Sequence, residues 1–225
     1  MRMKFLKRFE KDITVDRLKI FICSYTKMIL LLFLIVLVIY LLPVYPQPMV
    51  LHDFLTPHER NYIIKKAEDN LKPSTVSKTG ELMESVRKSE TAWLSYEDPV
   101  VMGVINKCLK HTDRPIRNCE MLQVLRYKPD GYYKPHQDII EGDENRRMYT
   151  FILALNDDYE GGETEFPNLN KTFKLKAGDA LFFDTLDNYE LATSKALHGG
   201  RPVKSGEKWI CNLWIKKYAV NIVDV

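Results

Sequence analysis

Hydrophobic residues follow three successive patterns along the chain, and the first is continuous. Residues 28–42 are fifteen apolar or aromatic residues in a row, and no charged residue occurs anywhere in 28–45. An eighteen-residue helix is about 27 Å long, close to the thickness of a bilayer's hydrocarbon core. A buried core helix is the alternative, but such helices normally keep a polar face, and this stretch has none. The pattern therefore predicts a transmembrane helix over residues 28–45.

The second pattern, in residues 54–112, is that of two amphipathic helices. One is predicted from Thr56 to about residue 71, because a proline follows Thr56 and a glutamate stands three residues after it, as in a capping box. The other is predicted from Asp98, again followed by proline, to about His111. The polar residues 72–88 between them predict a mobile loop.

From residue 119 onward the apolar stretches become short, and Gly, Pro, Asn or Asp separate them, with no helical pattern between. Strands are predicted at 119–127, 132–138, 147–155, 172–175, 180–184 and 207–216. Two helices followed by many short strands predict an α+β fold. Its core would be a double-sheet jelly roll over residues 119–217, supported by the helical part 54–112. In the last strand both faces carry large side chains, as expected where one face lines a pocket and the other packs on the helices.

Positive charge is concentrated in the residues before the apolar stretch. Residues 1–27 contain eight Lys/Arg and three Asp/Glu, and the next Lys or Arg after Lys27 is Arg60. The apolar stretch is followed by prolines and large residues, not by the small residues that signal cleavage requires, which predicts an uncleaved signal anchor. The positive-inside rule then predicts a single-pass type II protein. Its cytosolic tail would be residues 1–27, and residues 46–225 would lie in the lumen of the endoplasmic reticulum or secretory pathway.

The rest of the chain is close to neutral. Residues 28–225 contain 25 basic and 27 acidic residues, so the net charge of +3 belongs to the N-terminal tail. Nucleic-acid-binding domains usually carry a basic face of their own, so we expect no nucleic-acid partner.

Four cysteines and one glycosylation sequence bear on the compartment. Cys108 and Cys119 are close enough in sequence to form a disulfide in an oxidising lumen, and the sequence leaves open whether they do. We interpret Cys211 as a small core residue and Cys23 as a thiol beside the membrane span. Asn170 begins an Asn-Lys-Thr sequence, which can be glycosylated only on the lumenal side.

The candidate chemistry lies in two histidines and one aspartate. His136 and Asp138 are two residues apart, so in an extended strand their side chains point to the same side. His198, sixty-two residues after His136, would come from a distant strand. Two imidazoles and one carboxylate form the facial triad that binds non-haem Fe(II) and leaves positions open for other ligands.

Several motifs accompany this triad in a fixed order. They are Leu-Gln-Val-Leu-Arg-Tyr at 122–127, Gly-Gly-Glu-Thr-Glu-Phe-Pro at 161–167, Lys-Ala-Gly-Asp-Ala-Leu-Phe-Phe at 176–183, His-Gly-Gly-Arg-Pro-Val at 198–203 and Gly-Glu-Lys-Trp at 206–209. Over residues 119–217 this order resembles the catalytic domain of the prolyl 4-hydroxylases. The resemblance implies the double-stranded β-helix fold and a dioxygenase that uses Fe(II), O₂ and 2-oxoglutarate, with ascorbate as reductant.

The resemblance also implies roles for single residues. His136, Asp138 and His198 would be the metal ligands, and Lys208 would bind the far carboxylate of 2-oxoglutarate. Tyr127 and Thr150 stand where family members hydrogen-bond that co-substrate. The residues that match the family's peptide groove are Tyr133, Arg147 and Trp214. Aromatic side chains suit proline-rich peptides in the polyproline II form, and the loop 72–88 matches one that folds over bound peptide in relatives.

The sequence also departs from the family at one point. Arg201 stands where many members have a cysteine after the second histidine, so any disulfide or groove contact made by that cysteine would be lost. The expected reaction is hydroxylation of peptidyl proline to 4-hydroxyproline in proline-rich or collagen-like chains, with release of succinate and CO₂. Two alternatives stay open: hydroxylation of another side chain or of a small molecule, and a non-catalytic membrane-anchored peptide-binding module.

Overall fold

The computed structural model describes residues 21, 23–75, 83–140 and 142–220. It consists of two units, Met1–Pro43 and Val44–Val225, each described here by itself. Most of the basic tail and part of the loop predicted at 72–88 lie outside the described residues.

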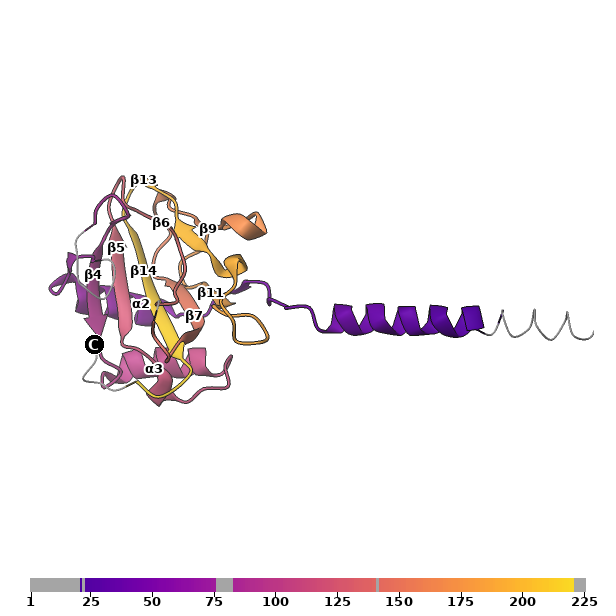
Figure 1. The fold of residues 1–225 in the computed structure, drawn as a ribbon. Coiled ribbons are helices and arrows are strands. Elements are labelled where there is room, and N and C mark those ends of the chain that lie inside the picture. The colour runs from indigo at the N-terminus through magenta and orange to yellow at the C-terminus, as the bar shows by residue number, and fades with distance from the viewer. Residues whose placement is uncertain (1–20, 22, 76–82, 141, 221–225) are drawn as a thin grey trace, which may run out of the picture. The chain divides into compact units, whose positions relative to one another are not determined.

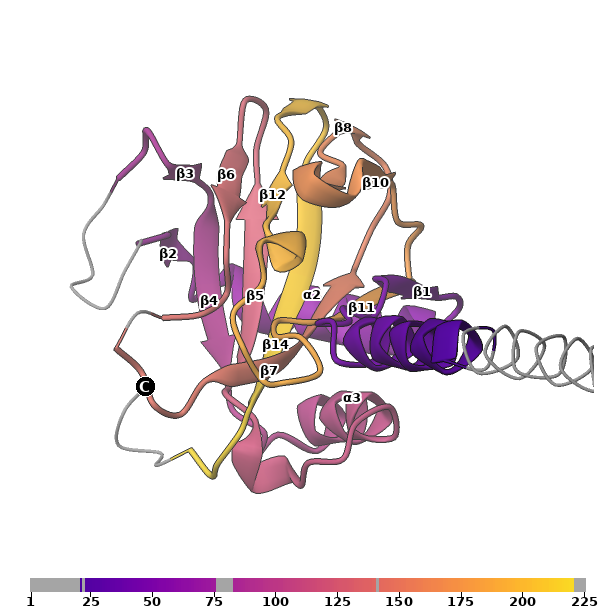
Figure 2. The same cartoon turned by 45° about the vertical axis from the view of Figure 1, so that its right-hand side comes forward.

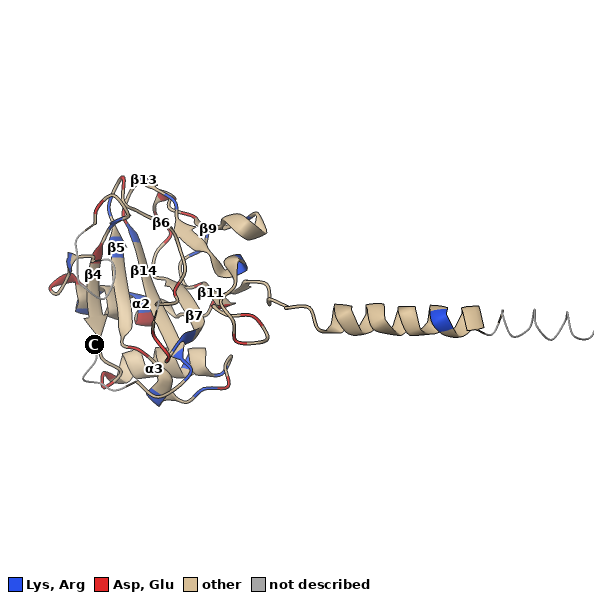
Figure 3. Cartoon of the chain, viewed as in Figure 1, with Lys and Arg blue, Asp and Glu red and all other residues tan. Residues whose placement is uncertain are grey.

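The described residues of the first unit contain one apolar helix. Its most hydrophobic window is Cys23–Tyr40, eighteen residues with a mean hydropathy of 2.2 and none of them buried. By length and composition alone this helix can cross a membrane. Lys27 is the charged residue of this window, shown in blue in Figure 3.

The apolar helix ends before residue 45, the predicted end of the span. The helix ends at Tyr40, and Tyr45 is a buried residue of the second unit. The Tyr45 hydroxyl donates a hydrogen bond to the backbone oxygen of Asp184 at 2.8 Å. An uncharged stretch therefore joins two environments, and hydropathy alone could not place the boundary between them.

The second unit is built on two antiparallel sheets and a two-stranded ribbon (Figures 1 and 2). The larger sheet has the order β1 (Met49–Leu51), β11 (Ala180–Asp184), β7 (Arg147–Ala154), β14 (Lys208–Lys216), β5 (Leu122–Tyr127), β4 (Glu90–Leu94) and β2 (Lys72–Pro73). The smaller sheet has the order β10 (Lys171–Phe173), β9 (Thr164–Phe166), β12 (His198–Gly200), β6 (Tyr132–His136) and β3 (Arg87–Lys88). The ribbon pairs β13 (Val203–Ser205) with β8 (Glu160–Gly161). This arrangement is consistent with the predicted jelly-roll core.

Two helices cover one face of the larger sheet. They are α2 (Pro57–Glu68) and α3 (Pro99–Leu109), and their buried residues share one apolar cluster with β5, β7 and β14. Both predicted N-caps are confirmed: Thr56 and Glu59 form the capping box, and the Asp98 carboxylate accepts hydrogen bonds from two backbone amides of α3. These caps fix the first turn of each helix, and so the direction in which it leaves the sheet.

A second apolar cluster fills the space between the two sheets. It includes Leu125 and Ile152 of the larger sheet and Phe166 of the smaller one. Strand β14 contributes to both clusters, because Ile210 faces this interior while Cys211 and Leu213 face the helices. The prediction of two heavy faces on the last strand is thus confirmed.

Several elements differ from those predicted. The part 54–112 is not purely helical, because β2, β3 and β4 lie within it and β4 pairs with β5. The predicted strand 132–138 ends at His136, which leaves Asp138 in a bend after it. Three short 3₁₀ helices interrupt the strand region or precede it, at Ile116–Asn118, Pro167–Leu169 and Ser194–Ala196. Strands of two or three residues carry too little periodicity to be recognised in sequence.

The open question of a disulfide is resolved by the buried cysteines. Cys108 and Cys119 are both buried free thiols, as is Cys211 in β14. Burial raises the pKa of each thiol, to about 12 for Cys119, so none is a reactive thiolate near neutral pH.

Candidate metal and co-substrate site

Two neighbouring strands of the smaller sheet bring the histidines together. His136 ends β6 and His198 begins β12, and the two residues are direct partners in the antiparallel register. Their ring centroids are 4.5 Å apart. One strand pair thus brings together two histidines that are sixty-two residues apart in the sequence.

Asp138 completes the cluster from the bend that follows β6. Its Oδ1 lies 3.6 Å from His136 Nε2, and its Oδ2 lies 3.7 Å from His198 Nε2. One ligand atom from each of the three residues lies within 4.8 Å of the others, so a single metal ion can be held among them. Asp138 and His198 are buried, whereas the His136 side chain keeps 21% of its surface exposed.

Hydrogen bonds orient both imidazoles toward this cluster. His136 Nδ1 lies 3.0 Å from the backbone oxygen of Lys134, and His198 Nδ1 lies 3.0 Å from that of Ala196. A carbonyl oxygen only accepts, so each Nδ1 carries the donated proton and each Nε2 presents a lone pair in the neutral tautomer. This is the arrangement that metal-binding histidines usually show.

The charges of the cluster also suit a cation. Burial lowers the pKa of His198 to about 4, although the Asp138 charge opposes this, so the ring is neutral near pH 7. Burial alone would raise the pKa of Asp138, but His198, His136 and Arg147 together lower it below its usual range. The cluster therefore offers a neutral nitrogen of His198 and an anionic oxygen of Asp138, and with a nitrogen of His136 these form the donor set of a facial triad.

Thr150 supports the Asp138 carboxylate, and its hydrogen bond to 2-oxoglutarate stays a prediction. Its hydroxyl donates a hydrogen bond of 2.7 Å to Asp138 Oδ2. In this arrangement the single hydroxyl proton is engaged by Asp138. Thr150 lies on β7 and pairs with Trp214 of β14, so the two side chains lie on the same face of the larger sheet. This is the face that points toward the triad.

Arg147 and Trp214, predicted as groove residues, lie beside Asp138; Trp214 is buried and Arg147 is half-buried. The Arg147 guanidinium donates to both oxygens of Glu120, at 2.7 and 2.8 Å, and to the backbone oxygen of Asp138 at 3.3 Å. Its Cζ lies 3.6 Å from the centroid of the Trp214 ring. Glu120 was missed in the sequence because an isolated glutamate near the start of a predicted strand is ordinarily a solvated residue.

Tyr133 lies directly against a triad histidine. Its ring stacks on that of His136, with centroids 3.6 Å apart and an angle of 19° between the planes. On β3, Arg87 pairs with Tyr133 in the register and places its guanidinium 4.7 Å from the Tyr133 ring. Arg87 is a second residue that sequence reasoning missed, since it lay in a segment predicted as a mobile loop.

Lys208 is a buried amine on the inward face of β14. Its Nζ donates to the backbone oxygen of Gly162 at 2.7 Å and lies 5.4 Å from the centroid of the Tyr127 ring. Burial and the neighbouring Lys174 lower the pKa of Lys208 to about 8, although Glu163 opposes the shift. The amine has no carboxylate partner among the described residues, and a buried cation of this kind favours an anionic ligand.

The triad and Lys208 face one interior. Phe166 and Phe183 pack against the His198 ring, with centroids 5.5 and 4.8 Å away. Both phenylalanines belong to the same apolar cluster as Tyr127, over which Lys208 lies. Cation, aromatic lining and metal ligands thus form one site between the two sheets.

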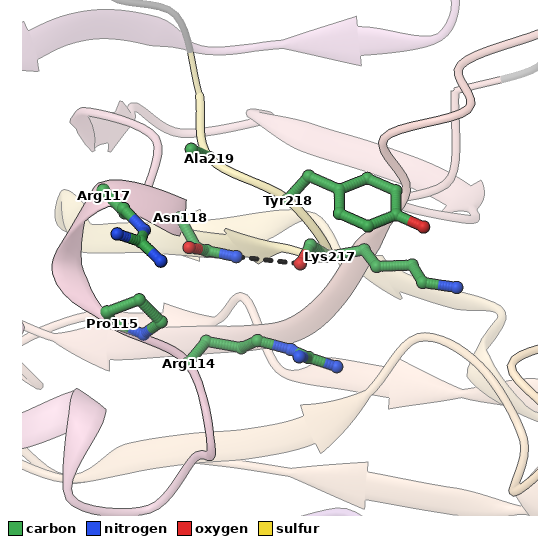
Figure 4. A pocket seen from close by; sticks show the side chains of 7 residues that line it. All are labelled: Arg114, Pro115, Arg117, Asn118, Lys217, Tyr218 and Ala219. Carbon is green, nitrogen blue, oxygen red and sulfur yellow. Dashed lines mark hydrogen bonds between the residues drawn. The ribbon is translucent and has the colours of Figure 1, made fainter.

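Other polar features lie apart from this site. His52 contacts Asp179 at 3.2 Å, and Arg201 forms an exposed ion pair with Glu165 at 2.7 Å. A surface pocket of about 400 Å³ contains none of the predicted site residues (Figure 4). It is lined by Arg114, Pro115, Arg117, Asn118, Lys217, Tyr218 and Ala219.

Known proteins resemble the chain in both sequence and structure. The model of the 2OG-Fe(II) oxygenase superfamily matches residues 122–216. A relative from Acanthamoeba polyphaga mimivirus is 35% identical over 185 residues, which cover 77% of this chain and 75% of that protein. Prolyl 4-hydroxylase 1 of Arabidopsis thaliana is 34% identical over 200 residues, covering 78% and 71% of the two chains. The structure of the viral collagen prolyl hydroxylase from Paramecium Bursaria Chlorella virus-1, a 2OG complex, superimposes with a TM-score of 0.64 at 32% identity. That match covers 78% of this chain and 97% of the viral one.

The close pairing of β6 with β12 requires that residue 199 have no side chain. A Cβ at this position would lie 2.9 Å from the Pro135 backbone nitrogen and 3.0 Å from the Tyr133 oxygen, whereas a Cβ on Gly200 would meet nothing closer than 3.8 Å. We expect Gly199→Ala to separate the strands and lower Fe(II) affinity by about tenfold or more, the effect of disturbing ligand orientation. Gly200→Ala is the matched control and should bind normally in an anaerobic calorimetric titration. Equal affinities for the two variants would contradict the prediction.

The hydrogen bond from Thr150 to Asp138 should also affect metal affinity. Thr150→Val keeps the shape of the side chain but removes the donor, and we expect Fe(II) affinity to fall about 10- to 100-fold, as for other residues that orient metal ligands. Thr150→Ser keeps the hydroxyl and should retain most of the affinity. Unchanged metal binding in the valine variant would show that Asp138 needs no such support.

Proposed function

Because the chain belongs to the prolyl 4-hydroxylase family of 2OG-Fe(II) oxygenases, we propose that it hydroxylates peptidyl proline to 4-hydroxyproline in proline-rich or collagen-like chains. Fe(II), 2-oxoglutarate and O₂ are the cofactors and co-substrates of this family, and ascorbate is its typical reductant. Together they oxidise an unactivated C–H bond to an alcohol and release succinate and CO₂. The observation that carries the proposal is the convergence of His136, Asp138 and His198 on one point.

The proposed roles of the polar residues follow from their surroundings. His136, Asp138 and His198 would hold Fe(II), and the Thr150 hydroxyl would hold Asp138 in place. Lys208 would bind the far carboxylate of 2-oxoglutarate, because this buried ammonium group has only a backbone oxygen as partner. Tyr127 lies beside that amine and would line the co-substrate end of the site.

The proposed peptide groove lies beside Tyr133, Arg147 and Trp214. Two buried donors near these residues, Arg87 Nη2 and Trp214 Nε1, have no hydrogen-bond partner among the described residues. A proline-rich peptide suits them, because proline lacks an N–H and presents mainly carbonyl acceptors. Tyr133 would pack against the proline ring, since its own ring already stacks on a metal ligand.

The proposed location follows from the charge pattern and from the apolar helix. The basic residues before Cys23–Tyr40 favour a cytosolic N-terminus, and the catalytic unit would then lie in the lumen of the endoplasmic reticulum or secretory pathway. Membrane lipid around the single span and a proline-rich polypeptide would be the partners. Asn170 is exposed and would be available for glycosylation there.

The activity itself can be tested with purified full-length protein. Supplied with Fe(II), 2-oxoglutarate, ascorbate and a (Pro-Pro-Gly) repeat peptide, it should add one oxygen atom to proline, detected by mass spectrometry, with matching succinate. His136→Ala should abolish both products, whereas His58→Ala, an exposed histidine of α2, should not. Succinate without peptide oxidation would indicate a different substrate. Peptide binding without turnover would indicate a non-catalytic peptide-binding module.

The low pKa of Lys208 predicts a pH dependence. The amine is cationic below its pKa of about 8 and neutral above it. Affinity for the 2-oxoglutarate carboxylate should therefore be full at lower pH and decline as pH rises through about 8, seen in kcat/KM for 2-oxoglutarate. Lys208→Arg stays charged over this range, so the decline should disappear, and Lys208→Met should be weak at every pH. A wild-type profile that stays flat through this range would remove Lys208 from the proposed role.

A further inference from the structure

The catalytic unit begins almost immediately after the apolar helix. Val44 exchanges two hydrogen bonds with Asn188, from its own N–H to Asn188 Oδ1 at 2.6 Å and from the Asn188 N–H to its oxygen at 3.0 Å. Tyr45 is buried, and Met49–Leu51 pairs with β11. Residues 44–51 are therefore bound along the catalytic unit and add no length to the tether.

The remaining tether is very short. Only residues 41–43 separate Tyr40 from Val44, so those two residues are at most about 14 Å apart in a fully extended chain. The window Cys23–Tyr40 has eighteen residues, about 27 Å of helix, against a hydrocarbon core of about 30 Å. With this helix in a bilayer, Tyr40 lies at the edge of the hydrocarbon and Val44 within or beside the headgroup layer.

The segment that binds Val44 is a tight loop with apolar side chains turned outward. Leu186 and Ala192 form a β-bridge, and the Asp187 carboxylate accepts hydrogen bonds from the N–H groups of Tyr189 and Leu191, at 2.9 and 3.0 Å. These bonds satisfy polar groups of the loop from within. Tyr189 and Leu191 nevertheless remain 45% and 56% exposed, close to Val44, which is 58% exposed.

Basic side chains flank the same loop. Lys217 forms an ion pair with Glu190, and Arg146 donates to the Glu190 backbone oxygen at 3.4 Å. Lys217 also lines the pocket of Figure 4, where Arg114 and Arg117 face the same hollow. The acidic groups of the loop are engaged, Asp187 with backbone amides and Glu190 with Lys217. Exposed apolar side chains beside basic ones are the composition that binds at a phospholipid surface.

We propose that Val44, Tyr189 and Leu191 form a lipid-facing patch that rests on the headgroup layer and orients the catalytic unit on the membrane. This inference rests on the proposed membrane anchorage, and it is independent of the reaction at the metal site. The short tether brings the patch to the bilayer, and the hydrogen bonds between Val44 and Asn188 fix the loop to the point where the chain leaves it.

The patch can be tested by fluorescence quenching in the full-length protein. A single reactive cysteine is introduced as Leu191→Cys in a Cys23→Ser background, since the other three cysteines are buried. Lys72→Cys is the control, because Lys72 is exposed on β2, at the opposite edge of the larger sheet from β1. Each variant carries a fluorophore and is placed in phosphatidylcholine nanodiscs containing headgroup-nitroxide lipid. We expect the label at 191 to be quenched several-fold more strongly than the label at 72.

The possible results distinguish the lipid-facing patch from the proposed membrane anchor and from the proposed reaction. Equal quenching at both positions, in protein that resists extraction by alkaline carbonate, would overturn the patch while leaving the anchor intact. Extraction by carbonate would overturn the anchor and the patch together. Peptide hydroxylation is measured on the same nanodiscs, so its absence with quenching preserved at 191 would count against the reaction and support the patch.

Discussion

The close pairing of β6 with β12 is the contact on which the site depends. It places His136 opposite His198 across one strand pair, and it exists because Gly199 has no side chain where the Pro135 backbone passes. Hydrogen bonds from each Nδ1 to a carbonyl two residues earlier then fix the rings, so the strands determine both the position and the tautomer of the donors. A site made in this way is preorganised, since few rotations remain to be lost when a metal binds.

Charged and polar side chains around the β6–β12 pair reduce the free-energy cost of burying the Asp138 carboxylate. Asp138 is an anion in a dry interior, and such a group is costly unless cations or donors surround it. Thr150 and Arg147 supply donors, and Glu120 in turn compensates Arg147. The Trp214 ring covers one face of the guanidinium. The support of the metal site and the wall of the proposed peptide groove therefore share residues, so changes to the groove would also be felt at Asp138.

Much of this could be predicted from the sequence, for reasons that differ from residue to residue. The caps at Thr56 and Asp98 are local, and local patterns are read directly from neighbouring residues. The triad and Lys208 were found because rare residue types stood in a recognisable order of motifs. Thr150, Arg147 and Trp214 were found as important positions, but their partners were not, since a hydrogen bond between distant strands leaves no periodic signal. Glu120 and Arg87 were missed for the same reason: an isolated charged residue looks solvated until the fold buries it.

The short strand β1 limits the association of the catalytic unit with other molecules. Residues 49–51 cover the outer side of β11, and without them the backbone N–H and C=O groups of Ala180–Asp184 would form an open sheet edge rich in phenylalanine and leucine. Open edges of that composition recruit strands from other molecules. The residues that join the apolar helix to the enzyme thus also cover this edge, and a soluble fragment that lacks residues 49–51 would expose it.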